Sequence, residues 1–245
     1  MGVVNPQSAT IPAMAFVPAS APAPRAPMLP NGDRLTRAEF ERRYIAMPQV
    51  KHAELIEGIV YTPSPVRLAH HGEPHARLIG WISHFVAKTP GIRCGDNATS
   101  RLDEDNEPQP DVMLLLPAGA GSSAVVDADG FVSGAPDLVC EVAASSVSID
   151  MHAKLNAYRR NGVREYLVWR VEDGAIDWFE LVDGRYVALP VDEGGVVRSR
   201  LFPGLWLDLP AMLRGDLAAV FFAVEQGTST AEHGALKDRI ASAKT

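Results

Sequence analysis

The segment 138–143, which reads LVCEVA, constrains the fold of this chain more than any other part of the sequence. It is a short and almost wholly apolar run that contains one carboxylate, Glu141. A run of this kind predicts a β-strand that is covered on both faces. A carboxylate inside such a strand is costly unless it is paired with a cationic group or binds a cation. The sequence therefore predicts a sheet buried between helices, with a charged partner for Glu141.

The surrounding pattern predicts a mixed α/β fold. Thr36 followed by Glu39 is typical of a capping box that opens a short helix ending before Pro48. Apolar residues recur at helical spacing within 74–88, and Gly162 is a helix-stop signal. Further helices are expected at 148–161 and 209–224. Strands are expected at 52–61, with a turn at Gly58, and at 92–102, 112–116, 138–143, 165–171, 175–181 and 185–189. The last three predict a C-terminal antiparallel meander, whereas 117–135 reads as an exposed loop.

Composition sets the domain boundaries. The chain has 245 residues, of which 47% are hydrophobic, enough for one well-formed core. Residues 1–30 hold 7 Pro and 7 Ala with hardly any charge, so we expect a disordered tail there. One domain is expected over 31–225, followed by a frayed tail at 226–245.

Several classes of protein are excluded or disfavoured. Phosphate-cradling motifs such as GxGxxG and GxxxxGK[ST] are absent, so we expect no organic cofactor of the nucleotide kind. No apolar run approaches the ~20 residues of a membrane helix, and the start of the chain lacks the features of a secretory signal. We therefore expect a cytoplasmic protein. The formal net charge of −7 argues against a general nucleic-acid coat.

The informative polar residues are acidic. Asp111 follows Pro110 at the mouth of an apolar strand, Glu141 lies within the strand described above, and Glu54 heads another short apolar segment. Lys154 lies on the next predicted helix, far enough along the chain to fold back over the sheet. Carboxylates from adjacent strands together with one ammonium group describe a Mg²⁺ site with a charge-stabilising lysine.

Other interpretations of these residues remain open at this stage. Glu141 could be the buried partner of Lys154 or Arg164 in a purely structural ion pair. Lys154 could instead pair on a helix surface with Asp150, four residues before it. His71 and His75 are also four residues apart and could share a metal if their helix starts early enough; surface histidines are the alternative.

The order of these motifs resembles the Uma-two family, which is assigned to the PD-(D/E)XK superfamily of restriction-endonuclease-like nucleases. The resemblance covers about residues 34–215. It rests on the joint order of 54–58 (ELIEG), 63–65 (PSP), 110–112 (PDV), 136–142 (PDLVCEV), Asp150-x3-Lys154-x3-Tyr158 and 162–166 (GVREY).

The resemblance implies a restriction-endonuclease-like core, with a mixed central sheet flanked by helices. It implies that Asp111 and Glu141 ligate Mg²⁺, for which Mn²⁺ can substitute, and that Glu54 is a further acidic member of the catalytic set. Ala143 stands where the superfamily's E-x-K pattern has its lysine, and the family's relocated lysine corresponds to Lys154. A second departure is that 144–148 lacks the proline often found there, which leaves the geometry of this loop open.

The implied activity is Mg²⁺-dependent hydrolysis of DNA phosphodiester bonds by an endonuclease. The alternative is a nuclease-fold protein that no longer cuts and acts in DNA or protein binding. A homodimer is plausible, because cutting two strands commonly uses two copies of one site. Arg67, Arg77, Arg93 and Arg101 are candidates for phosphate contacts, with a solvated surface role as the alternative for each.

Overall fold

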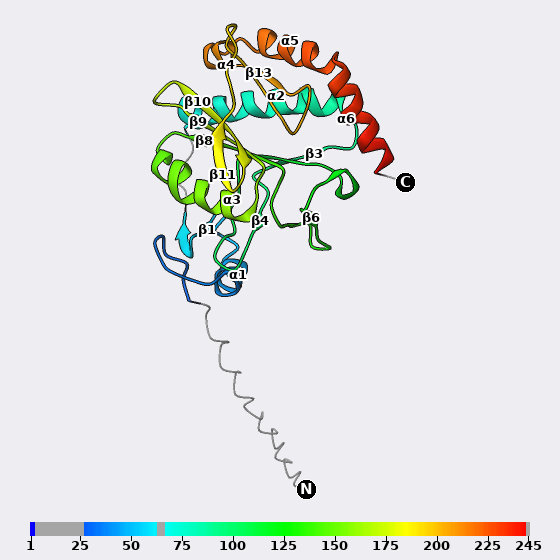
Figure 1. The fold of residues 1–245 in the computed structure, drawn as a ribbon. Coiled ribbons are helices and arrows are strands. Elements are labelled where there is room, and N and C mark those ends of the chain that lie inside the picture. Colours follow the sequence, from blue (N-terminus) through cyan, green and yellow to red (C-terminus); the bar gives the residue numbers. More distant parts are fainter. Residues whose placement is uncertain (3–26, 63–66, 244–245) are drawn as a thin grey trace.

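A six-stranded mixed sheet forms the centre of the protein, in a computed structural model that describes residues 1–2, 27–62 and 67–243 (Figure 1). The strand order is β11-β10-β9-β8-β5-β3, in which only β8 and β9 are parallel. The strands are β3 (Arg93–Asp96), β5 (Val112–Leu115), β8 (Leu138–Ala143), β9 (Glu165–Arg170), β10 (Ala175–Val182) and β11 (Arg185–Ala188). The expected mixed sheet and its antiparallel meander, β9-β10-β11, are confirmed.

Strand β8 is buried on both faces, as its apolar sequence predicts. Leu138, Cys140 and Val142 belong to the core on one face of the sheet. Val139 and Ala143 belong to the core on the opposite face. Because side chains alternate along a strand, Glu141 shares the face of Val139 and Ala143.

The first face of the sheet is covered by α2 (Glu73–Lys88), whose buried Leu78, Trp81, Ile82 and Phe85 enter that core. A π-helical turn, η1 (Leu68–Gly72), leads directly into α2. Outside α2 lies α5, which packs against both α2 and the small hairpin β12-β13 (Figure 1). The remaining elements of this layer are β12 (Val196–Arg198), β13 (Trp206–Asp208), α4 (Leu209–Arg214), α5 (Leu217–Thr228) and α6 (Ala231–Ser242).

The second face is covered by one helical segment that changes its hydrogen-bonding pattern midway. It begins as a π-helical turn, η3 (Ile149–Lys154), and continues as α3 (Leu155–Asn161). Gly162 ends it with a left-handed backbone, φ 85°, as the stop signal predicts. Tyr158 on α3 packs against Tyr166 of β9, with ring centroids 5.0 Å apart.

A small N-terminal unit packs beside the sheet, next to the segment that leads into β5. It consists of α1 (Arg37–Ile45) and the hairpin β1 (Glu54–Ile56) and β2 (Ile59–Tyr61), and it has its own apolar cluster around Phe40 and Leu55. Thr36 caps α1 by accepting from the Glu39 N–H, which confirms the predicted helix start. Leu55 exchanges two backbone hydrogen bonds with Glu107, and these tie the hairpin to the approach of β5.

Three expectations about chain organisation need correction. The segment 117–135 is not a simple loop, because it holds a short helical turn, η2 (Ala118–Ala120), and two strands, β6 (Val125–Val126) and β7 (Val132–Ser133). The two strands form a three-stranded sheet with β4 (Ser100–Arg101). The predicted helix 209–224 is two helices, α4 and α5, separated at Gly215, whose φ is 79°.

The predicted frayed tail at 226–245 is wrong for the part that is described. Thr230 caps α6, and Leu236 and Ile240 of that helix are buried in the main core. At the other end, Leu29 is buried against the N-terminal cluster. The rest of the expected disordered tail, residues 3–26, and the motif at 63–65 lie outside the described residues. Among the described helices, none has the length and apolar character needed to cross a membrane.

Candidate active site

A cleft of about 1190 Å³ opens where β5 begins and β8 ends. Its walls come from η1 and the start of α2 on one side and from η3 on the other, and β1 adds Glu54. All four predicted site residues line it: Glu54, Asp111, Glu141 and Lys154. Asp137, another acid that follows a proline, lies apart from the cleft, where it pairs with Arg164 and accepts the Leu116 N–H.

The sheet register explains why Asp111 and Glu141 meet. In the antiparallel β5-β8 pair, Val112 lies opposite Cys140 and Met113 opposite Val139. Continuing this register by one residue brings Asp111 opposite Glu141, on the same face of the sheet. The Val142 N–H donates to Asp111 Oδ2 at 2.7 Å, which fixes the carboxylate at the end of the strand pair.

Glu141 is buried and is held by groups from the helix that covers it. Its Oε1 accepts from Lys154 Nζ at 3.0 Å and from the Tyr158 hydroxyl at 2.7 Å. Burial raises the pKa of Glu141, and the positive charge of Lys154 opposes that rise. The expected charged partner of this strand carboxylate is therefore Lys154 and not Arg164.

Lys154 is buried and meets three carboxylates. Its Nζ lies 2.9 Å from Glu54 Oε1, 3.0 Å from Glu141 Oε1 and 3.7 Å from Asp150 Oδ1. Burial alone would lower the pKa of Lys154, but the carboxylates of Glu141, Glu54 and Asp150 outweigh it and raise the pKa, so the ammonium stays charged. The interpretation of Lys154 as a surface helix residue is thus wrong.

Asp150 was predicted only as a helix-surface partner, yet it is buried beside the ammonium. Burial raises its pKa against the opposing charge of Lys154. Its Oδ2 accepts from the Ser146 hydroxyl at 2.5 Å, and its main-chain oxygen accepts from the Tyr166 hydroxyl at 2.9 Å. The four-residue spacing to Lys154 was visible in the sequence; its burial follows from the position of η3 against the second face of the sheet.

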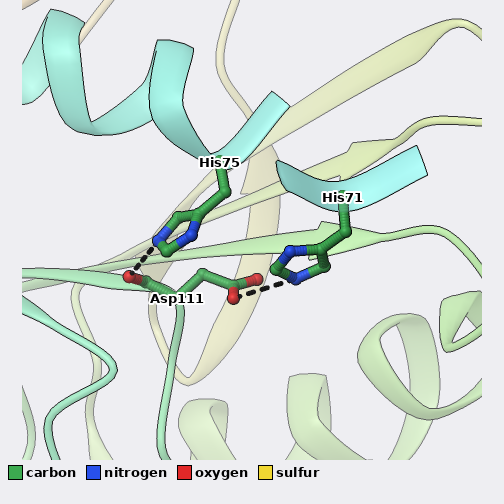
Figure 2. Close-up of side chains that lie close together, drawn as sticks. All are labelled: His71, His75 and Asp111. Atoms are coloured by element: carbon green, nitrogen blue, oxygen red, sulfur yellow. Dashed lines mark hydrogen bonds and ion pairs between the residues drawn. The ribbon is translucent and has the colours of Figure 1, made fainter. Parts of the chain in front are cut away.

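The two histidines of the sequence pattern lie at the opposite wall (Figure 2). His71 Nε2 is 3.1 Å from Asp111 Oδ1, and His75 Nε2 is 3.0 Å from the main-chain oxygen of Asp111. The hydrogen bond from His71 together with its charge holds the pKa of Asp111 below its ordinary value, although burial acts in the other direction. The condition that their helix starts early is met, because η1 begins at Leu68.

Both π-helical turns of the described chain border the cleft, η1 with His71 and η3 with Asp150 and Lys154. Single π turns inside helices occur frequently at functional sites, because they shift side chains relative to the regular α-helical positions. Apolar periodicity could not indicate them, since both helices read as ordinary amphipathic segments from the sequence.

The four candidate arginines fall into different surroundings. Arg67 is exposed and lines the cleft. Arg101 is half-buried and pairs with Glu41 and Asp127, so it is engaged within the protein. Arg77 pairs with Glu73 on the surface of α2, and Arg93 is exposed on the edge strand β3.

The donors in the cleft fit a divalent cation. Asp111 and Glu141 supply carboxylate oxygens from adjacent strands, which are ligands that Mg²⁺ accepts. Among the described residues, the one group of three or more metal-ligand side chains with donor atoms within 4.8 Å of one another is His71, His75 and Asp111. Glu141 lies outside this group and contacts Lys154 and Tyr158.

Comparisons with known proteins agree with this architecture. A crystal structure described as a "putative nuclease belonging to DUF820 from Anabaena variabilis" aligns with a TM-score of 0.54 and 14% sequence identity. The alignment covers 70% of this chain and 97% of that one, so the two share an α/β fold.

The sequence model of the Uma2 family, described as "Putative restriction endonuclease", matches residues 37–210. The chain therefore belongs to the Uma2 family, which confirms the resemblance drawn from its motifs. No curated protein sequence matches the chain.

Proposed function

We propose that this protein is a Mg²⁺-dependent endonuclease that hydrolyses phosphodiester bonds of DNA in the cleft described above. The observation that carries this proposal is the meeting of Asp111 and Glu141 on adjacent strands with the charged ammonium of Lys154, in a cleft open to solvent. Membership of the Uma2 family supports the same class of reaction.

In this mechanism Asp111 and Glu141 would hold the cation. When bound, Mg²⁺ supplies a Lewis acid that polarises a phosphate oxygen and lowers the pKa of water. Lys154 provides the positive charge that offsets negative charge building up on the phosphate in the transition state. Glu54 positions Lys154 through the 2.9 Å contact, and its own Oε1 is fixed by the Gln109 N–H at 2.7 Å.

Plasmid nicking with Mg²⁺ or Mn²⁺ tests the proposal. Asp111→Asn, Glu141→Gln and Lys154→Met should each lower the rate by about 100-fold or more, as for the loss of other electrostatic stabilisers of a transition state. Lys88→Met is the matched control, because Lys88 is an exposed lysine of α2 that pairs with Glu225 and lies off the cleft. Equal rates in the wild type and the three cleft variants would remove these residues from the mechanism.

Two observations favour a second candidate, a nuclease-fold protein that binds DNA or protein without cutting. Lys154 already neutralises carboxylates within the protein, and the chain carries a formal net charge of −7. A protein of this kind would bind DNA in a gel-shift assay with Mg²⁺ present and leave plasmid intact at every metal concentration. If the cluster is purely structural, added Mg²⁺ would also leave the melting temperature unchanged.

A homodimer with two cleft sites remains part of the proposal for double-strand cutting. Sedimentation with and without DNA measures it. A protein that stays monomeric and produces only nicked circles would act on one strand at a time.

A further inference from the structure

His71 and His75 lie on successive turns at the mouth of the cleft and face the same carboxylate. Their ring centroids are 5.5 Å apart, and with Asp111 they place one donor atom each within 4.8 Å of the others. Figure 2 shows that the ring nitrogens not engaged with Asp111 lie on the facing sides of the two rings. The π turn η1 causes this arrangement, because it carries the chain from His71 into the first turn of α2, where His75 lies.

One donor of this group has no role within the protein fold. His71 Nδ1 is buried, and it has no hydrogen-bond partner in the part of the chain that the structure describes. Buried polar atoms are nearly always satisfied, so an unpaired ring nitrogen beside a second imidazole and a carboxylate requires an explanation. An ion pair between His71 and Asp111 engages only Nε2 and leaves Nδ1 unexplained.

The second nitrogens of both rings are oriented as they are around protein-bound metals. His71 Nε2 faces Asp111 Oδ1, and His75 Nε2 faces the Asp111 main-chain oxygen and Asp96 Oδ1, the latter at 3.1 Å. A metal-ligating histidine almost always donates its other N–H to a carboxylate or a backbone carbonyl, which fixes the ring and its tautomer.

Two imidazole nitrogens as ligands select among cations. Mg²⁺ is a hard ion that prefers oxygen ligands, whereas Mn²⁺, Co²⁺ and Zn²⁺ accept imidazole, with affinities that rise across that series. The pair Asp111 and Glu141 has only oxygen donors and would not show this preference.

We propose that the Nδ1 atoms of His71 and His75 bind a divalent transition-metal ion in preference to Mg²⁺, with Asp111 as the hydrogen-bond partner that orients both rings. This inference rests on the proposed function, because Asp111 takes part in both sites. It adds a second, nitrogen-ligated ion to the cleft that would hold DNA. The acidic site residues that the family resemblance implies do not assign a role to either histidine.

Metal binding by the purified, metal-free full chain tests this site without any nuclease assay. Mn²⁺ is titrated and the free ion is counted by electron paramagnetic resonance, with Mg²⁺ as competitor. We expect one tight Mn²⁺ site at which Mg²⁺ competes only at about 100-fold or greater excess, apart from any Mn²⁺ held by Asp111 and Glu141, which Mg²⁺ should displace readily. Pulsed measurements on the wild-type complex should show ¹⁴N couplings from coordinated imidazole. The proposal is overturned if no bound Mn²⁺ shows nitrogen coupling, or if Mg²⁺ competes equally for all of the bound Mn²⁺.

Variants locate the site. His71→Gln and His75→Gln should each weaken Mn²⁺ binding by about 100-fold or more, since even outer-shell partners of a metal contribute 10–100-fold. His70→Gln is the matched control, because His70 lies on the same turn but is exposed and pairs with Glu172. Unchanged binding in the first two variants, or loss only in His70→Gln, assigns the ion elsewhere.

The outcomes separate this site from the proposed function. If Mn²⁺ binds with nitrogen coupling but the protein does not cut DNA, the metal site is supported and the endonuclease proposal is contradicted. If His71→Gln cleaves plasmid with Mg²⁺ as fast as the wild type and bound Mn²⁺ shows no nitrogen coupling, the endonuclease proposal is supported and the metal site is contradicted.

Discussion

Lys154 is the residue on which the buried charges of the cleft depend. Lys154→Met should lower the free energy of unfolding by about 3–5 kcal/mol, because it leaves buried carboxylates without their cation. The double variant Glu141→Gln with Lys154→Met should cost less than the sum of the two single changes, since the two groups interact directly. Urea denaturation followed by tryptophan fluorescence measures all three. Additive losses would mean that the ion pair contributes nothing specific.

Glu107 provides a separate test at residue scale, away from the cleft. Burial, together with the neighbouring Glu41 carboxylate, raises the pKa of Glu107 to about 8, while Glu41 pairs with Arg37 and Arg101. A carboxyl group whose pKa is higher in the folded state stabilises the fold at low pH. This contribution is lost as the pH rises from the ordinary pKa of a glutamate, about 4.5, through about 8.

The wild type should therefore lose stability between pH 5 and pH 8, by at most about 1.4 kcal/mol per pH unit from this group. Glu107→Gln has no proton to lose there and should show a flatter profile. Glu104→Gln, which changes an exposed glutamate nearby, should keep the wild-type profile. Denaturation curves across this pH range measure the difference, and identical profiles for the wild type and Glu107→Gln would contradict the prediction.

At the residue scale the sequence identified Glu54, Asp111, Glu141 and Lys154, because a charged group in or beside an apolar strand is conspicuous. It could not show that Asp150 is buried or that Tyr158 donates to Glu141. Both facts depend on how the helical segment η3-α3 is rotated against the sheet. The π turn η3 sets this rotation, and the spacing of apolar residues in the sequence does not reveal a π turn.

At the scale of elements, we predict opposite effects on stability for alanine substitutions at two helical glycines, Gly227 and Gly234. A Cβ at Gly227 of α5 would lie 2.5 Å from the Gly204 carbonyl oxygen and 2.9 Å from the Trp206 ring. Gly227→Ala should therefore destabilise the protein by about 1–3 kcal/mol through overpacking.

Gly234 of α6 is the matched control, since a Cβ there meets nothing within 4 Å. Gly234→Ala should stabilise the protein by about 0.5–1 kcal/mol through helix propensity. Thermal melts of both variants measure this contrast. Similar effects of the two substitutions would mean that α5 does not pack closely on the loop before β13.

Element prediction succeeded where one signal dominated. Strand β8 has the predicted bounds, and α3 ends at Gly162 as expected. It failed at 209–224, where a nearly continuous apolar run hides the break at Gly215. The local signals were nevertheless present, because Gly215 ends α4 in the left-handed conformation and Asp216 caps α5 by accepting from the Ala219 N–H.

At the scale of the whole molecule, α6 belongs to the domain and is not an appendage. Ending the chain after Ser229 would remove buried Leu236 and Ile240 from the main core. Because burial of each such side chain contributes about 1.5–3 kcal/mol, we expect a loss of several kcal/mol and exposure of apolar surface. Dye binding and urea denaturation measure both effects, and a truncated chain as stable as the full one would support the original expectation of a frayed end.

The side chains of the cleft lie far apart in the sequence, from Glu54 near the start of the folded chain to Lys154 a hundred positions later. Glu54 lies on β1, which is not part of the central sheet. A ribosome adds residues in order, so a nascent chain carries Glu54, His71, His75 and Asp111 well before the lysine that neutralises the carboxylates of the cleft. The catalytic set that we propose is thus incomplete until most of the domain has been synthesised. A nuclease built in this way has no competent fragment to release if translation stops early.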